Sequence, residues 1–162
     1  MTLAINSAVP DISLPMTNTA IGASQQFKLS NYRGKTVVLY FYPKDNTPGC
    51  TSESIAFRDA HPAFLAENAV IFGISRDSLK SHDNFKNKIE MPFELISDSE
   101  ELLCTQFDVI KRKMMYGKQV RGIERSTFII NAEGVLIQEW RKVKVAHHID
   151  EVLDFVKTLA SH

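Results

Sequence analysis

An unbroken apolar run in the first third of the chain constrains the fold most. Residues 36–42 read Thr-Val-Val-Leu-Tyr-Phe-Tyr, and β-branched and aromatic residues without polar alternation are typical of a strand buried on both faces. Two prolines and a glycine then stop the run, and residues 50–58 have a helical pattern. The chain is therefore organised around a buried strand, a short loop and a helix.

The remaining segments predict further strands and helices around this strand. Strands are expected at residues 26–30 (a short strand or turn), 69–75, 93–97, and in a hairpin of 126–130 with 135–140. Helices are expected from 50 to about 60 with a kink or restart at Pro62, after Asp77 or Ser78, after Asp98 or Ser99, and over 148–159. Prolines before Ile21 predict an edge segment and loop, and residues 111–123 are expected to form a basic loop.

This order of elements predicts an α/β fold with a central mixed β-sheet and helices on both faces. A thioredoxin-like fold is the best match. The chain has 162 residues, of which 44% are hydrophobic, which is enough for one core. We therefore expect residues 1–162 to form a single domain.

Charge and hydropathy exclude two classes of partner. Nineteen basic and nineteen acidic side chains give a net charge of zero, so the basic surface that nucleic-acid binding needs is absent and self-association is not discouraged. We expect a monomer or a weak homodimer. The first residues lack the pattern of a secretory leader, and no stretch approaches the roughly 20 apolar residues of a membrane span. The sequence thus predicts a cytoplasmic protein with no membrane partner.

Cys50 is the strongest candidate for a functional side chain. It lies where the strand gives way to the helix, and unpaired backbone N–H groups and the helix dipole at such a junction favour a thiolate. A buried, inert cysteine is the alternative for a cysteine in general. The proline and glycine directly before Cys50, on a loop after a central strand, favour a functional thiol.

Two residues of the preceding loop can assist this thiol. Thr47 occupies the position that a second cysteine would take in a thioredoxin-type redox pair, so no local disulfide can form. Its hydroxyl can donate to a thiolate and accept from a hydroperoxide, although it can equally cap the helix or tighten the turn. Pro43 would shield the thiolate from water; the alternative is that it only ends the strand.

The loop and helix start, residues 43–51, resemble the signature of peroxiredoxins of the bacterioferritin comigratory protein, or peroxiredoxin Q, group. The signature reads Pro-Lys-Asp-Asn-Thr-Pro-Gly-Cys-Thr. The resemblance extends through residues 72–78, 95–98, 116–118 and 125–130 and covers nearly the whole chain. It implies an antioxidant thiol peroxidase, dependent on thioredoxin or a similar thiol, that reduces hydrogen peroxide and organic hydroperoxides without a cofactor.

The resemblance also implies roles for individual residues. Cys50 would be the peroxidatic cysteine, with Thr47, Pro43 and Arg125 completing the site. The sequence supports Arg125 independently, because an arginine at the start of a strand could reach the helix N-terminus and add a permanent cation beside the thiolate. Without the motif, Arg125 would be taken for a surface arginine. Attack on the peroxide would leave Cys50 as a sulfenic acid, which a second thiol must resolve.

The sequence departs from the group's pattern at the resolving cysteine. The two usual places hold Ile55 and Lys86, and the other cysteine of the chain is Cys104. Its neighbours, Leu103 and Phe107, suggest core packing rather than chemistry. A one-cysteine cycle resolved by thioredoxin, glutaredoxin or glutathione is therefore favoured, with a two-cysteine cycle through Cys104 as the alternative.

Other readings of the sequence are weaker. The five histidines form no metal-ligand spacing with the cysteines, so no metal site is expected. A cysteine phosphatase is disfavoured because the first arginine after Cys50 is Arg58, which is expected in mid-helix. A thioredoxin-like redox sensor without enzymatic activity remains the main alternative, since it would use the same thiol.

Overall fold

The computed structural model describes residues 3–18 and 24–160, and it contains a seven-stranded sheet, four α-helices and a separate two-stranded ribbon. The sheet runs in the order β2-β1-β5-β4-β3-β8-β9. Its strands are β1 (Ser13–Thr17), β2 (Ser24–Lys28), β3 (Thr36–Phe41), β4 (Ala69–Ser75), β5 (Glu94–Ser97), β8 (Ser126–Ile130) and β9 (Leu136–Trp140). Strands β3, β4 and β5 are parallel and the other pairs are antiparallel. The predicted mixed sheet is thus confirmed.

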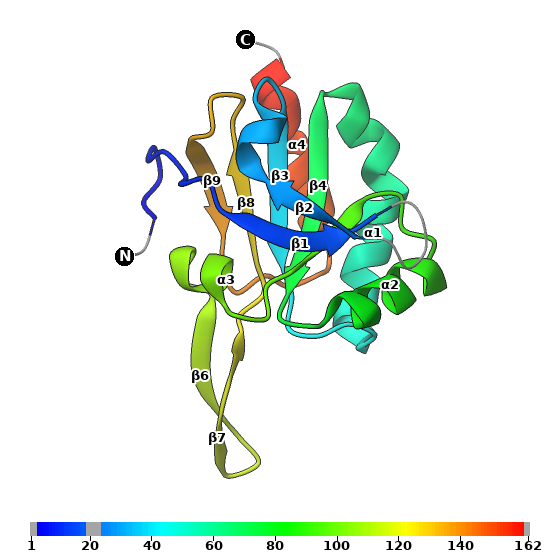
Figure 1. Cartoon of the computed structure of the whole chain (residues 1–162), viewed down its shortest axis with the longest axis vertical. Coiled ribbons are helices and arrows are strands. Elements are labelled where there is room, and N and C mark those ends of the chain that lie inside the picture. Colours follow the sequence, from blue (N-terminus) through cyan, green and yellow to red (C-terminus); the bar gives the residue numbers. More distant parts are fainter. Residues whose placement is uncertain (1–2, 19–23, 161–162) are drawn as a thin grey trace.

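Strand β3 separates two hydrophobic cores, because successive side chains of a strand point to opposite faces. Val37, Leu39 and Phe41 pack in one core, and Val38 and Tyr40 pack in the other. The second core takes side chains from α1 (Pro48–Ala66), α2 (Leu79–Lys88) and α4 (His148–Ala160). The first takes them from α3 (Leu102–Gln106) and the short 3-10 helix η1 (Leu29–Tyr32). Helices therefore cover both faces of the sheet, as predicted (Figure 1).

The first expected helix is longer than predicted at both ends. It begins at Pro48 rather than Cys50 and continues through Pro62 to Ala66. Proline is well suited to the first turn of a helix, because a backbone N–H at that position would have no acceptor within the helix. Pro62 removes one internal hydrogen bond, but Phe57 and Phe64 on either side of it are both fully buried and in ring contact. This packing keeps the helix continuous.

Two segments predicted as loops are strands. The side chains of Leu14 and Met16 in β1 are buried in the core. Strand β1 lies between β2 and β5 rather than at an edge of the sheet, although it pairs with β5 only at Met16. The end of that predicted loop, near Ile21, lies outside the described residues. The predicted basic loop is a ribbon of β6 (Ile110–Met115) and β7 (Lys118–Ile123) that extends away from the sheet (Figure 1).

The ribbon escaped prediction because most of it is exposed and so lacks an apolar alternation. Its turn consists of Tyr116 and Gly117, both with positive φ (53° and 77°), as in the type I′ turns of tight hairpins. Tyr116 is 99% exposed, and Met114 and Met115 beside it are exposed as well. No helix in the described part of the chain is long and apolar enough to cross a membrane.

Candidate active site

Cys50 is the third residue of α1 and is delivered there by the loop that follows β3. Thr47 precedes the helix with an extended backbone (φ −103°), and its carbonyl accepts the first helical hydrogen bond, from the Thr51 N–H at 2.8 Å. The N–H groups of Gly49 and Cys50 therefore precede the helical ladder and face the helix start. The Cys50 side chain is buried, with 1% of its surface exposed. A buried sulfur thus lies at the positive end of a helix dipole.

Arg125, just before β8, brings a cation to this sulfur. Its Nη2 donates to Cys50 Sγ at 3.4 Å, and its Nη1 donates to Glu53 Oε1 at 2.6 Å. A Cβ on Gly49 would lie 3.1 Å from Nη2, so the glycine leaves room for the guanidinium. The planar fork of arginine suits two simultaneous contacts of this kind. The structure therefore brings Cys50 and Arg125 together as the sequence predicted.

Glu53 is a site residue that the sequence analysis did not select. It lies one helical turn after Cys50, on the same face of α1, and it is fully buried. Burial raises its pKa to about 7, even though the charge and hydrogen bond of Arg125 act to lower it. Burial acts to lower the pKa of Arg125, but Glu53 and Cys50 outweigh it and the pKa is raised. The three-residue spacing from Cys50 was the available signal.

Thr47 and Pro43 lie beside the site without a hydrogen bond to the sulfur among the described residues. The Thr47 hydroxyl donates to the Lys44 carbonyl at 2.9 Å, so in this conformation its hydrogen is not given to Cys50. Its oxygen can still accept from a hydroperoxide. Pro43 is exposed and lines a cavity of about 580 Å³ that Arg125 also lines. The predicted roles of both residues stay predictions.

That cavity gives access to the guanidinium side of the site and is mostly basic. Its other lining residues are Lys111, Arg112, Lys113, Ile123, Glu124, Lys142 and Val143. They come from the base of the ribbon and from the segment after β9. A small polar molecule could approach Arg125 through this opening.

Cys104 lies on the other side of the sheet from Cys50. It packs in the core of Leu39, Phe41 and Phe107, whereas Cys50 packs in the core of Tyr40 and Phe57. Burial, followed by the nearby carboxylate of Asp98, raises the pKa of the Cys104 thiol. The fold therefore separates the two sulfurs by the central strands.

One group of side chains has metal-ligand atoms within 4.8 Å of one another, namely Asp45, Asp77 and His82. Most of their polar atoms are already engaged by protein partners. Asp45 accepts from Tyr42 and Ser81, and Asp77 accepts from the hydroxyl of Ser75. The arrangement is that of a hydrogen-bond network, and the sequence analysis did not anticipate it because its members lie on separate elements.

Comparisons with known proteins agree with this geometry. A model of the AhpC/TSA family matches residues 5–139. Peroxiredoxin Bcp of Bacillus subtilis is 49% identical over 160 residues (99% of each chain), and peroxiredoxin Bcp of Xanthomonas campestris is 53% identical over 141 residues (87% of this chain, 88% of that one).

A solved structure of the bacterioferritin comigratory protein of Xanthomonas campestris, concerned with its alkyl peroxide reduction activity, is also similar. It has a TM-score of 0.84 and 51% identity, and the match covers 92% of each chain. These similarities confirm the thioredoxin-like fold and the resemblance seen in the sequence. The chain belongs to the AhpC/TSA family and is a thiol-dependent peroxidase of its peroxiredoxin Bcp, or peroxiredoxin Q, group.

Proposed function

We propose that Cys50 is the peroxidatic cysteine of this peroxidase and that it reduces hydrogen peroxide and organic hydroperoxides, alkyl hydroperoxides included. The observation that carries this proposal is the 3.4 Å contact between Arg125 Nη2 and Cys50 Sγ at the start of α1. A guanidinium and free N–H groups stabilise both a thiolate and the charge that develops on peroxide oxygens. The relative from Xanthomonas supports alkyl peroxides as substrates.

In the first step, the Cys50 thiolate attacks the distal peroxide oxygen and a new S–O bond forms as the O–O bond breaks. The proximal oxygen leaves with the electron pair and takes up a proton to become an alcohol, or water when the substrate is hydrogen peroxide. The distal oxygen, with its proton, stays on the sulfur as a sulfenic acid. Arg125 stabilises the charge spread over both oxygens, and the Thr47 hydroxyl oxygen accepts a hydrogen bond from the hydroperoxide O–H.

The second half of the cycle uses an external thiol. The thiol condenses with the sulfenic acid, water leaves, and a mixed disulfide forms; a second thiol then releases Cys50 and carries away the disulfide. Thioredoxin, glutaredoxin and glutathione are the candidate reductants. A two-cysteine cycle through Cys104 is disfavoured because a disulfide needs Cα atoms within roughly 7 Å, and the two cysteines pack on opposite faces of the sheet.

Counting turnovers with matched cysteine variants tests this proposal. With excess thiol, the wild type and Cys104→Ser should both consume many equivalents of hydroperoxide per chain, and Cys50→Ser should consume none. A redox sensor would consume about one equivalent and stop. Persistent turnover in Cys50→Ser, or loss of turnover in a folded Cys104→Ser, would overturn the proposed cycle.

A further inference from the structure

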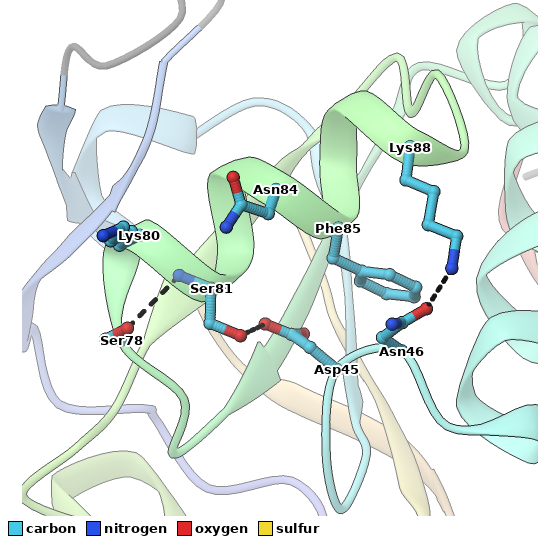
Figure 2. Close-up of a pocket in the computed structure, with 8 residues that line it drawn as sticks. All are labelled: Asp45, Asn46, Ser78, Lys80, Ser81, Asn84, Phe85 and Lys88. Carbon is cyan, nitrogen blue, oxygen red and sulfur yellow. Dashed lines mark hydrogen bonds between the residues drawn. The ribbon is translucent and has the colours of Figure 1, made fainter.

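The loop that carries the chain from β3 to Cys50 is fastened to α2 through Asp45. This carboxylate is buried, although its neighbours Lys44 and Asn46 are exposed. Its Oδ1 accepts from the Tyr42 hydroxyl at 2.6 Å. Its Oδ2 accepts from the Ser81 hydroxyl at 2.8 Å (Figure 2). A buried carboxylate with such partners is costly to pull away from them.

His82 completes the attachment from within α2. The ring is fully buried, with Nδ1 2.7 Å from Asp45 Oδ2 and Nε2 2.9 Å from the Ile96 carbonyl oxygen. A carbonyl oxygen can only accept, so Nε2 donates to Ile96, while Nδ1 makes the hydrogen bond with the Asp45 carboxylate. His82 therefore ties the loop both to α2 and to strand β5.

Two more contacts fix the same loop at the two ends of α2. The Asp45 N–H donates to Asp77 Oδ2 at 2.9 Å, just before the helix. Lys88 Nζ donates to Asn46 Oδ1 at 2.7 Å, at the last residue of the helix (Figure 2). Since Asp45 and Asn46 lie only five and four residues before Cys50, these contacts also fix the start of α1.

This attachment matters because the two halves of the reaction need different access to the sulfur. Cys50 is only 1% exposed. A hydroperoxide is small and meets the sulfur beside Arg125, whereas an external thiol has to bring its own sulfur, with the rest of its carrier, to within bonding distance of Sγ. The start of α1 and the preceding loop must move to admit it, and the contacts of Asp45 oppose that movement.

We propose that Asp45 and His82 are positioning residues that set how often Cys50 becomes accessible to the reductant. They keep the site closed for attack on the peroxide and so limit the rate of the thiol step. This inference rests on the proposed function of Cys50. It predicts that weakening the Asp45–His82 contact speeds the thiol step and leaves the rate of the peroxide step nearly unchanged. A site that opens tenfold more often can still be closed most of the time, so the closed form that reacts with peroxide stays populated.

The test measures the two steps separately in His82→Gln. Rapid-mixing experiments give the rate constant for oxidation of Cys50 by hydrogen peroxide, and then that for reduction of the sulfenic acid by dithiothreitol. We expect the rate constant of the thiol step to rise about tenfold, because a buried hydrogen-bonded partner of Asp45 is lost. The rate constant of the peroxide step should stay within about twofold of the wild-type value. A thiol step that is unchanged or slower would overturn the inference, as would a similar fall in both steps.

Two further variants of α2 separate positioning from stability. Ser81→Ala removes one hydrogen bond to Asp45 and should speed the thiol step by a smaller factor, which keeps the test decisive if His82→Gln does not fold. Ser78→Ala removes the N-cap that accepts from the Ser81 N–H at 3.2 Å without removing a partner of Asp45. It should leave both steps at the wild-type rates; an increase of the thiol step as large as that in Ser81→Ala would contradict the inference.

A measurement without peroxide keeps this inference distinct from the proposed function. The rate at which a bulky maleimide alkylates reduced Cys50 reports exposure of the sulfur itself. It should rise in His82→Gln and Ser81→Ala but not in Ser78→Ala, whether or not the enzyme turns over. Equal alkylation rates in all four proteins would refute the inference even if Cys50 proved to be the peroxidatic residue.

Discussion

The two cysteines of this chain are equally buried, and everything else about their surroundings differs. Cys50 has 1% of its surface exposed and Cys104 has none. A helix N-terminus and the Arg125 guanidinium face the first sulfur. The second lies among aromatic rings beside the carboxylate of Asp98, which accepts from the Cys104 N–H at 2.7 Å. A cation therefore contacts the first sulfur, whereas a carboxylate lies near the second.

This comparison teaches that depth in the core does not separate the proposed peroxidatic cysteine from the cysteine assigned to packing. Burial alone disfavours a thiolate, and at Cys104 burial and Asp98 act together to raise the thiol pKa. At Cys50 the Arg125 guanidinium and the free N–H groups of α1 face the sulfur, and Glu53 holds that arginine in place. The proposed reactive site therefore depends on charges brought from distant parts of the chain.

Removing the Arg125 guanidinium should have the largest effect on the rate of the peroxide step. Without this cation, the surroundings of Cys50 become more like those of Cys104. In Arg125→Gln we expect the rate constant for Cys50 oxidation by hydrogen peroxide to fall by about 10²–10³-fold, the usual effect of losing one transition-state donor. Arg125→Lys should recover only part of this, since an ammonium lacks the planar fork that reaches both Cys50 and Glu53. Rapid-mixing kinetics measure the rate.

Arg121→Gln is the matched control for Arg125. This arginine pairs with Glu101 and is 44% exposed, so its loss should change the peroxide step little. An equal fall in both variants would mean that general charge, and not the contact with Cys50, sets the rate.

Glu53 sharpens the comparison through the pH dependence of stability. Its pKa rises from an ordinary 4.5 to about 7 on folding, so between these values the folded state binds more protons at Glu53 than the unfolded state. Stability is then highest at low pH and falls as pH rises through this window, by roughly 3 kcal/mol. Glu53→Gln should lack this fall, as measured by urea denaturation across pH 4–8.

His148 makes the stability of the fold change with pH in the opposite direction. Burial, with a smaller effect from Arg125, lowers its pKa to about 4, so its contribution to stability is lost as pH falls below 6.5. The wild type and Glu53→Gln both contain His148, so the difference between their free energies of unfolding isolates the contribution of Glu53. A difference that does not change with pH would refute this account of the buried carboxylate.

Serine substitution at each cysteine should separate function from packing. Cys104→Ser places a hydroxyl in an apolar core and should lower the free energy of unfolding by about 1–3 kcal/mol, while peroxide turnover stays at the wild-type rate. Cys50→Ser should abolish turnover at a smaller cost in stability, because its position already offers polar partners. Denaturation midpoints and turnover assays on the same samples test this contrast between the two variants. A loss of turnover in a folded Cys104→Ser would contradict it.

Thr47 should have the smallest effect. Thr47→Val removes a hydroxyl that donates to the Lys44 carbonyl and can accept from the substrate, and one lost hydrogen bond of about 1 kcal/mol corresponds to a rate loss of about tenfold or less. Thr47→Ser keeps the hydroxyl and should stay near the wild-type rate. A much larger loss in Thr47→Val would show that the hydroxyl contacts the sulfur during reaction.

The sequence predicted the parts of this molecule that local pattern determines. The buried strand, the helix after it and the hairpin around Asn131 carry strong periodic and turn signals, and all are present. Proline content misled the prediction at β1 and at Pro62, where packing against the core outweighs local preference. The ribbon was missed because main-chain pairing and a tight turn hold it together without an apolar face.

The candidate site shows the same division. Cys50 and Thr47 were selected because they share one short motif, and Arg125 because the motif's family implied it. Glu53 was missed as a partner of Arg125 since 72 residues separate them in sequence. Asp45 and His82 were missed for the same reason, because only the fold brings the loop against α2.

The mass of the intact protein after one equivalent of hydrogen peroxide tests the central claim most directly. If Cys50 alone carries the oxidising equivalent, the wild type and Cys104→Ser should each gain one oxygen atom, which added thiol then removes, and Cys50→Ser should not change. A loss of two hydrogens in the wild type that is absent from Cys104→Ser would instead show an internal disulfide, and the contrast between the two cysteines would be wrong.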